Sequence, residues 1–105
     1  MNKLAQKLFP RAQHTCHKHC AVVYRRGNII STGVNSGEIH AEVAALKKLW
    51  PDQRIGTRVV SMRLTRGGNL GLAKPCPECE AYMRANGVKS VIYSTNDGLM
   101  AKMKL

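Results

Sequence analysis

The sequence predicts an α/β fold with a mixed β-sheet and helices on its faces. Segments rich in β-branched residues alternate with segments of helical periodicity, in the order β-β-α-β-α-β. Apolar residues make up 44% of the 105 residues, which is enough to form a packed core without disulfides. We therefore expect one domain over residues 1–105.

A β-hairpin is expected near the start of the chain. Residues 19–25 contain the β-branched pair Val22 and Val23, and the turn Arg26-Gly27-Asn28 separates them from a second strand over residues 29–34. Two later strands are expected over residues 57–65 and 88–94.

The clearest expected helix covers residues 39–50. Apolar residues recur at helical spacing from Ile39 to Trp50, so Trp50 is expected in the core. Pro51 ends this helix, and residues 51–56 are expected to be a linker. The other expected elements are helices over residues 2–9, 76–86 and 97–105, with a Gly-rich loop over residues 66–73.

The charge of the chain indicates an anionic partner. Seventeen Lys and Arg against six Asp and Glu give a net charge of +11, which attracts nucleic acids and phosphorylated molecules. A basic protein with no nucleic-acid partner is the alternative. The sequence contains no apolar run of membrane-spanning length and no secretory signal in residues 1–10, so no membrane association and a cytoplasmic location are expected.

Three residues are candidate ligands of a zinc ion. Cys76 and Cys79 are spaced so that both thiols project from one helical turn, and His40 begins another helix. Three protein ligands leave one position open for water, as in catalytic zinc sites. We also expect the helix N-terminus to lower the pKa of the two thiols. Without a secretory signal, metal binding is favoured over disulfides for this cysteine pair.

Glu42 is a candidate proton carrier. It lies about 200° around the helix from His40, so it is not a second ligand by spacing. A carboxylate near the helix start can take a proton from a zinc-bound water. The motif Cys-x-x-Cys alone also occurs in structural zinc sites and redox pairs. The joint order His-x-Glu then Pro-Cys-x-x-Cys is the signature of zinc nucleobase deaminases.

The chain resembles the cytidine deaminase superfamily at these residues and beyond them. Cys20-Ala21-Val22-Val23 and the segment from Ile29 to Asn35 are similar to the first hairpin of that family. Lys74-Pro75-Cys76-Pro77-Glu78-Cys79 and the segment from Gly87 to Ser94 are similar to its second zinc helix and fourth strand, and the run from Tyr93 to Gly98 is similar to small viral and phage members.

The resemblance implies a three-layer α/β/α sandwich around a five-stranded sheet, although a fifth strand is hard to find in the short C-terminus. It implies hydroxide on zinc attacking the amino-bearing carbon of a base, with Glu42 as proton shuttle and His40, Cys76 and Cys79 as ligands. It also implies substrate contacts from Asn35 to the sugar, from Ala41 to the base, and from Pro75 to the departing amino group. Asn35 as a plain turn residue, and Ala41 and Pro75 as plain helix-start residues, are the alternatives. Family members are often oligomers, so a homo-oligomer is expected.

A second group of potential ligands precedes the first strand: His14, Cys16, His17, His19 and Cys20. If His19 and Cys20 begin a strand, their side chains point to opposite faces and do not share an ion. A second zinc site, a contact of His17 or His19 with a phosphate or base, and no special role remain alternatives.

Several substrates fit the signature. The first is a cytosine base converted to uracil in a nucleoside or nucleotide, and the second is a base within RNA or single-stranded DNA. Deamination of adenine or guanine bases, tRNA-type or free, is an alternative, as is a non-catalytic zinc-binding nucleic-acid module. The charge of +11 favours phosphate-bearing substrates without deciding among them.

Overall fold

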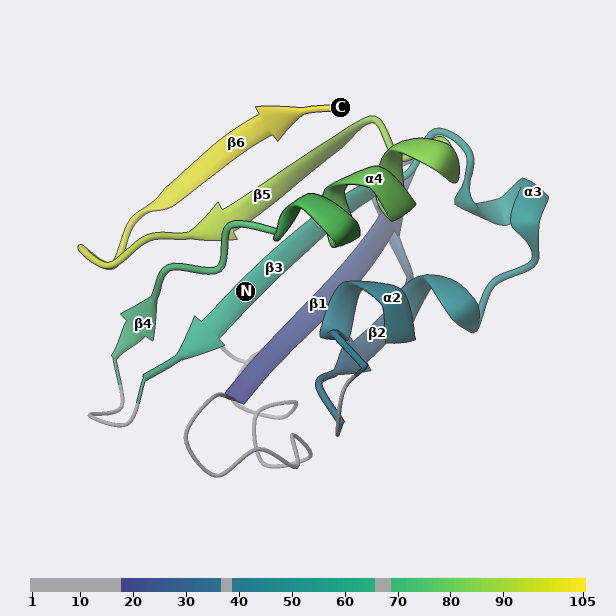
Figure 1. Ribbon diagram of the computed structural model, residues 1–105. Helices are drawn as coiled ribbons and strands as arrows, with labels where there is room; N and C mark the ends of the chain where they lie inside the picture. The colour runs from purple at the N-terminus through teal and green to yellow at the C-terminus, as the bar shows by residue number, and fades with distance from the viewer. Residues whose placement is uncertain (1–17, 37–38, 66–68) are drawn as a thin grey trace.

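The computed structural model describes residues 18–36, 39–65 and 69–105. Their strands form one twisted sheet, and the helices lie beside it (Figure 1). The predicted order β-β-α-β-α-β is found in β1, β2, α2, β3, α4 and β5, and the structure adds α3, β4 and β6. The elements are β1 (Lys18–Arg25), β2 (Asn28–Val34), α2 (Ala41–Lys47), α3 (Pro51–Arg54), β3 (Arg58–Leu64), β4 (Leu70–Gly71), α4 (Pro77–Ala85), β5 (Ser90–Ser94) and β6 (Met100–Lys104).

The sheet is mixed, as predicted. Its strand order is β2-β1-β3-β5-β6, with β4 paired to β3. β1 runs antiparallel to β2 and β3, whereas β3 and β5 are parallel because α4 connects them as a crossover. The expected hairpin is confirmed: Arg26 and Gly27 form its turn with φ of 54° and 81°, the left-handed conformation that a two-residue hairpin turn requires.

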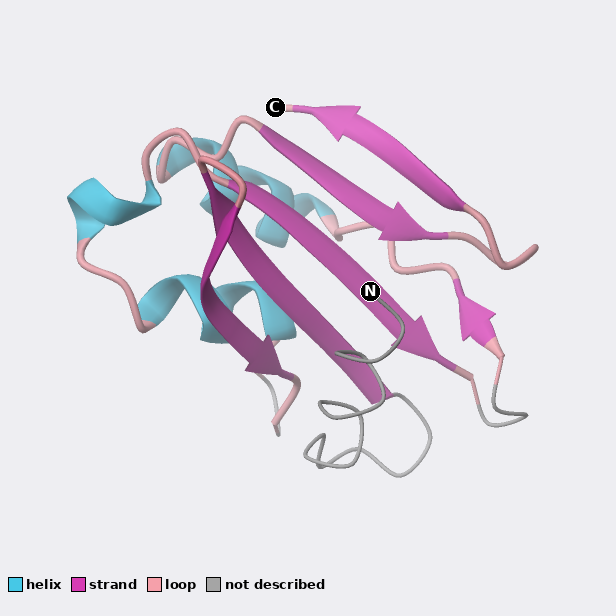
Figure 2. Cartoon of the chain, turned by 180° about the vertical axis from the view of Figure 1, so that it is seen from behind, coloured by secondary structure: helices cyan, strands magenta, loops and turns pink. Residues whose placement is uncertain are grey.

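Helices α2 and α4 cover the same face of the sheet, and Figure 2 shows the opposite face toward the viewer. The main core lies under these helices, where Leu46 of α2 and Met83 of α4 pack with Val23, Val59 and Val91 of the strands. The opposite face carries a second apolar cluster around Val22, Val60 and Met62. In the described ranges the helices α2 and α4 therefore form one layer, and the expected helix over residues 2–9 lies outside those ranges. No described helix is both long and apolar enough to cross a membrane.

The prediction of a helix over residues 97–105 is wrong. This segment forms β6, which pairs antiparallel with β5 from Ser90↔Lys104 to Ser94↔Met100. The chain reverses at Gly98, whose φ of 81° suits a tight turn, and the open edge of β5 then supplies hydrogen-bond partners. Met103 alternates with Lys102 and Lys104 and packs against the main core, which is a strand pattern of period two. β6 is also the additional strand that the sequence left unplaced.

The prediction that Trp50 belongs to the core is also wrong. Helix α2 ends at Lys47, so the helical spacing does not extend to Trp50, whose side chain is 76% exposed. Trp50 instead precedes a second short helix, α3, with Pro51 at its first position. The expected linker over residues 51–56 therefore contains a helical turn, and the expected loop over residues 66–73 contains β4.

Candidate metal and catalytic site

The position of α2 is fixed by a close approach to β2. A Cβ atom on Gly33 would lie 2.5 Å from both the carbonyl oxygen of Ala41 and the backbone nitrogen of Ala45. The hydroxyl of Ser31 donates a hydrogen bond to the carbonyl of Ala45, 2.6 Å away. A residue without a side chain at position 33 thus lets the first turn of α2 rest on the sheet, with His40 as its N-cap.

Helix α4 brings the two cysteines to the same place. Cys76 is its N-cap, Pro77 follows at the first helical position as predicted, and Cys79 lies in the first turn. The preceding loop is held to the end of β5 because the backbone N–H of Ala73 donates to the carbonyl of Ser94. The N-terminal ends of α2 and α4 consequently lie at the same end of the helix pair, over one face of the sheet (Figure 1).

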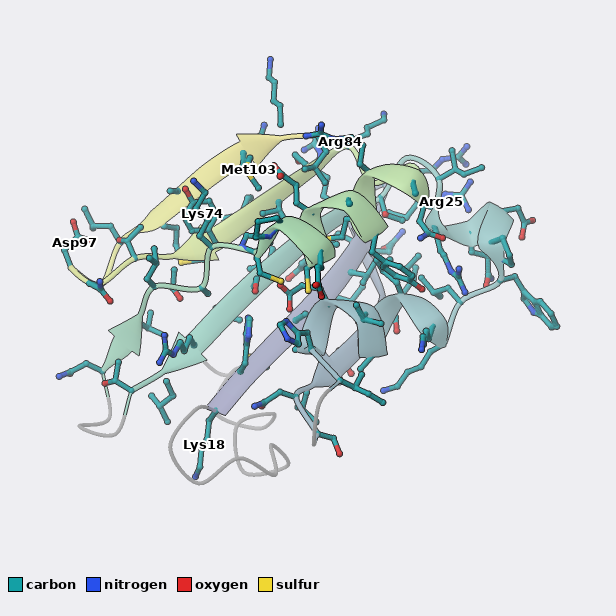
Figure 3. The ribbon with its side chains drawn as sticks, viewed as in Figure 1. Lys18, Arg25, Lys74, Arg84, Asp97 and Met103 are labelled. Atoms are coloured by element: carbon teal, nitrogen blue, oxygen red, sulfur yellow. The ribbon has the colours of Figure 1, made fainter. Side chains whose placement is uncertain are left out.

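His40, Cys76 and Cys79 form the set of ligand atoms that the sequence predicted. Their nitrogen and sulfur atoms all lie within 4.8 Å of one another. Nδ1 of His40 is 3.8 Å from Sγ of Cys76 and 3.1 Å from Sγ of Cys79. Tetrahedral zinc with ordinary bond lengths separates such a nitrogen and sulfur by about 3.6 Å, so these residues fit the ion. Yellow sulfur atoms are visible between the ribbons of α2 and α4 (Figure 3).

Glu42 lies beside this set but deep in the protein. Its side chain is 1% exposed, and its Oε1 atom is without a hydrogen-bond partner among the described residues. A buried carboxylate oxygen without a partner is costly, so such an atom usually serves a ligand, a water or a reaction. This orphaned oxygen is consistent with a site that binds a further group next to the three ligands.

His19 is a neighbour of Glu42 that the sequence motifs did not select. Its Nε2 atom lies 3.7 Å from Oε1 of Glu42 and forms a short hydrogen bond with the hydroxyl of Ser61. Its backbone N–H donates to Oδ1 of Asn35, 2.9 Å away, and its carbonyl accepts from the backbone N–H of Asn35. His19 therefore connects Glu42 and Asn35, two predicted site residues. This connection depends on strand pairing across the sheet, and no sequence motif indicates it.

The electrostatics of the site differ from the prediction for the thiols. Burial is the main cause that raises the pKa of Cys79, and the carboxylate of Glu42 raises it further. The expected lowering by the helix N-terminus is therefore wrong for Cys79, whose thiol is buried next to the Glu42 carboxylate. Burial also lowers the pKa of His19, partly opposed by Glu42, so the imidazole is neutral at neutral pH.

The other predicted site residues are close to this centre. Asn35 is buried at the end of β2, Ala41 is fully buried at the start of α2, and Pro75 is buried before Cys76. A cavity of about 310 Å³ also opens beside His40 and Cys79 between α2 and α4.

The second group of potential ligands is divided by the sheet. His19 faces the helices, whereas Cys20 belongs to the apolar cluster on the other face, so the predicted separation of the two is confirmed. Burial raises the pKa of the Cys20 thiol to about 12. The remaining members, His14, Cys16 and His17, lie outside the described residues.

Comparisons with known proteins match this geometry. Residues 1–95 match the family model described as the cytidine and deoxycytidylate deaminase zinc-binding region. The fold resembles the crystal structure of the dCMP deaminase from cyanophage S-TIM5 in its apo form, with a TM-score of 0.66 and 24% identity, over 92% of this chain and 82% of that one. No curated protein sequence matches the chain.

Proposed function

Because the chain belongs to the cytidine and deoxycytidylate deaminase zinc-binding family, we propose that it is a zinc-dependent hydrolase that converts a cytosine base to uracil and releases ammonia. Zinc is the metal of this family. The observation that carries the proposal is the buried carboxylate of Glu42, whose Oε1 atom has no hydrogen-bond partner among the described residues, beside the set His40, Cys76 and Cys79. A structural zinc site has no need of such a carboxylate.

The three ligands and Glu42 have separate roles in this proposal. His40, Cys76 and Cys79 hold zinc, which when bound supplies a Lewis acid that brings the pKa of a water molecule near neutrality. Glu42 takes a proton from the water, whose oxygen would add to the amino-bearing carbon of the base, and delivers protons to the base so that the C–N bond breaks and the amino group leaves as ammonia. Its burial supports this role because a carboxylate shielded from bulk water keeps the proton within the site.

His19 positions Glu42. The Ser61 hydroxyl fixes one side of the imidazole, and the neutral ring lies 3.7 Å from the carboxylate. The imidazole therefore limits the positions that the Glu42 side chain can take, and its own place is fixed by Ser61. Because the backbone of His19 also binds Asn35, the same strand aligns the proton carrier with a residue that we propose contacts the sugar.

Ala41 and Pro75 complete the proposed substrate site. Both precede or begin the first turn of a ligand-bearing helix, where backbone groups have no partner within the helix. We assign the backbone of Ala41 to the base and the carbonyl of Pro75 to the departing amino group. Their proximity to His40 and Cys76 in the chain supports these assignments.

The substrate that we favour is a cytosine nucleotide with a terminal phosphate. The similar cyanophage structure is that of a dCMP deaminase, and a net charge of +11 suits a phosphate-bearing substrate. A cytosine within a polynucleotide, a purine base and a zinc module without turnover are the competing candidates.

A substrate panel tests the proposal. Purified zinc-loaded protein is offered deoxycytidine, its monophosphate, a cytosine-containing oligonucleotide, adenosine monophosphate and guanine, and ammonia release is measured. We expect turnover of the monophosphate, loss of turnover in Glu42→Gln, and normal turnover in the matched control Glu80→Gln, whose carboxylate lies at the surface beside Arg84. Turnover that survives Glu42→Gln contradicts the mechanism, and turnover of the oligonucleotide alone contradicts the substrate.

A further inference from the structure

Among the described residues, the charged side chains on the face of the sheet opposite α2 and α4 are all cationic. The five acidic residues that the structure describes lie in the helices or in the turn between β5 and β6, and none lies in a strand. These five acidic residues are Glu42, Asp52, Glu78, Glu80 and Asp97. By contrast, basic side chains project from several strands on the opposite face. The described acidic residues are therefore confined to the helices and one turn, whereas cations occur on both sides of the sheet.

Strand register places these basic side chains in two adjacent rows. In the first row Tyr24 pairs with Arg58, Arg58 with Ser90, and Ser90 with Lys104. In the second row Val60 pairs with Ile92, and Ile92 with Lys102. Residues paired across strands point to the same face, and Val60 belongs to the apolar cluster opposite the helices. Arg58, Lys102 and Lys104 therefore share that face, and all three are exposed.

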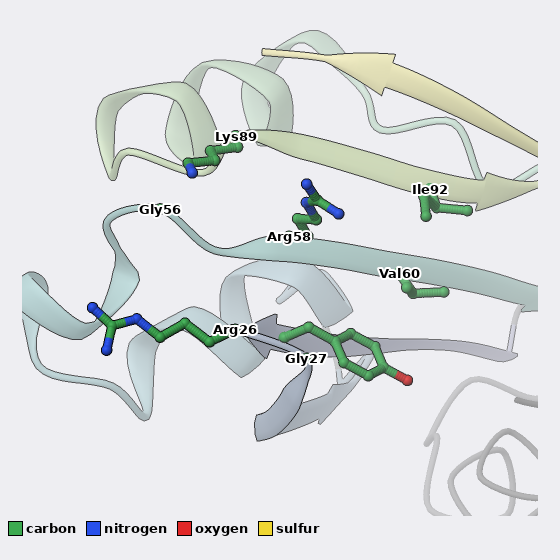
Figure 4. Close-up of a pocket in the computed structure, with 8 residues that line it drawn as sticks. Arg26, Gly27, Gly56, Arg58, Val60, Lys89 and Ile92 are labelled. Atoms are coloured by element: carbon green, nitrogen blue, oxygen red, sulfur yellow. The ribbon is translucent and has the colours of Figure 1, made fainter.

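A cavity of about 500 Å³ opens at one end of these rows (Figure 4). Tyr24, Val60 and Ile92 give it an apolar lining, and Arg26, Arg58 and Lys89 give it three cations. Neither ion pair of the described residues involves these cations, and the lining contains no carboxylate. Three uncompensated cations around an apolar floor attract a ligand that has both phosphates and flat bases.

We propose that this face binds single-stranded polynucleotide, at a site separated from the zinc ligands by the sheet. Phosphates would contact Arg58, Lys102 and Lys104, and a base would enter the cavity beside Tyr24. Neighbouring strands lie about 4.8 Å apart, so the rows from β1 to β6 span about 14 Å. That length exceeds one phosphate group and favours a chain of nucleotides over a free nucleotide.

The test is binding of a fluorescein-labelled oligothymidylate of about 16 nucleotides to the full zinc-loaded chain, followed by fluorescence anisotropy at several salt concentrations. Thymine has no amino group to lose, so turnover does not affect the measurement. The double variant Arg58→Gln/Lys102→Gln removes two charges from the face. The matched control Lys48→Gln/Arg84→Gln removes two charges from the helix side; Arg84 is labelled on α4 in Figure 3.

We expect the double variant to bind about tenfold more weakly, and the slope of log affinity against log salt to fall in magnitude by about 1.4, because each single-strand phosphate contact contributes about 0.7. The control pair should bind as the unchanged chain does. Equal weakening by both pairs, or no binding by the unchanged chain, overturns the proposal. Displacement of the oligonucleotide by an equal phosphate concentration of thymidine monophosphate overturns it as well.

The same proteins separate this inference from the proposed deaminase activity. Glu42→Gln should bind the oligothymidylate with unchanged affinity, because Glu42 lies on the helix side of the sheet. The chain could deaminate no substrate and yet bind oligothymidylate more weakly in Arg58→Gln/Lys102→Gln than in Lys48→Gln/Arg84→Gln. That result would support the binding proposal and contradict the deaminase proposal. Weaker oligothymidylate binding by Glu42→Gln would instead place the polynucleotide at the zinc site and overturn the inference.

Discussion

The Nε2 atom of His19 lies 3.7 Å from the Oε1 atom of Glu42, and the same nitrogen forms a hydrogen bond with the Ser61 hydroxyl. Glu42 is 1% exposed, and its Oε1 is without a hydrogen-bond partner in the described ranges. His19 in β1 is thus a titratable neighbour of the carboxylate and can restrain its position. This relationship connects the sheet to the proposed proton carrier.

Removing this restraint should slow catalysis without weakening substrate binding. We expect His19→Ala to lower kcat about 10- to 100-fold with little change in KM, because a small misplacement of a catalytic group is costly. His19→Gln should restore part of the rate, since its amide group also offers polar atoms beside Ser61 and Glu42. Steady-state kinetics of zinc-loaded protein measure both parameters.

Serine substitutions provide the control for this experiment. Ser61→Ala removes the hydroxyl that fixes His19 and should lower kcat to a smaller extent than His19→Ala. Ser90→Ala in β5 removes another buried hydroxyl, which has no hydrogen-bond partner among the described residues, and should leave kcat unchanged. Equal effects of Ser61→Ala and Ser90→Ala would show that the losses reflect general destabilisation rather than positioning.

Metal content should depend on the three predicted ligands alone. Purified protein should contain one equivalent of zinc, and Cys76→Ser, Cys79→Ser or His40→Ala should each lose most of it. Cys20→Ser should retain the full equivalent, because this thiol lies on the opposite side of the sheet. Elemental analysis with circular dichroism measures metal and fold together. Zinc retained in all three ligand variants, or two equivalents in the unchanged chain, would contradict this assignment.

The free energy of unfolding should fall as the pH is lowered through the range where histidine titrates. The pKa of His19 is lowered by burial, so below about pH 6.5 the unfolded chain binds a proton that folded His19 does not. The free energy of unfolding should therefore decrease by up to about 1.4 kcal/mol per pH unit from there down to the lowered pKa.

Urea unfolding of metal-free protein tests this, because zinc ligands release protons of their own when metal binds. His19→Gln should flatten the pH dependence in that window. A slope that is unchanged in His19→Gln would assign the titration to another group.

Gly33 should tolerate no side chain. An added Cβ would meet the backbone of α2 at 2.5 Å, so Gly33→Ala should lower the free energy of unfolding by about 1 to 3 kcal/mol. Because α2 carries His40 at its N-cap, zinc affinity should fall as well. The neighbouring Thr32→Ala in β2 is the control and should leave zinc affinity unchanged. An unchanged zinc affinity in Gly33→Ala would show that α2 can shift without moving His40.

The local sequence determined the hairpin, the helix that begins at Pro77, and the order of strands and helices. These features depend on neighbouring residues: Arg26 and Gly27 form their turn in place, and Pro77 starts its helix without help from distant segments. The zinc ligands were also predictable, because the order His-x-Glu then Pro-Cys-x-x-Cys is itself informative.

Only the tertiary structure decided the rest. The segment after Gly98 became β6 because the edge of β5 offered partners, and Trp50 became exposed because α2 ended earlier than its periodicity implied. The contact of His19 with Glu42 requires β1 to lie beside β3 and under α2, a pairing between residues far apart in the chain. Periodicity describes what a segment can form, whereas the surfaces available for burial and hydrogen bonding select what it does form.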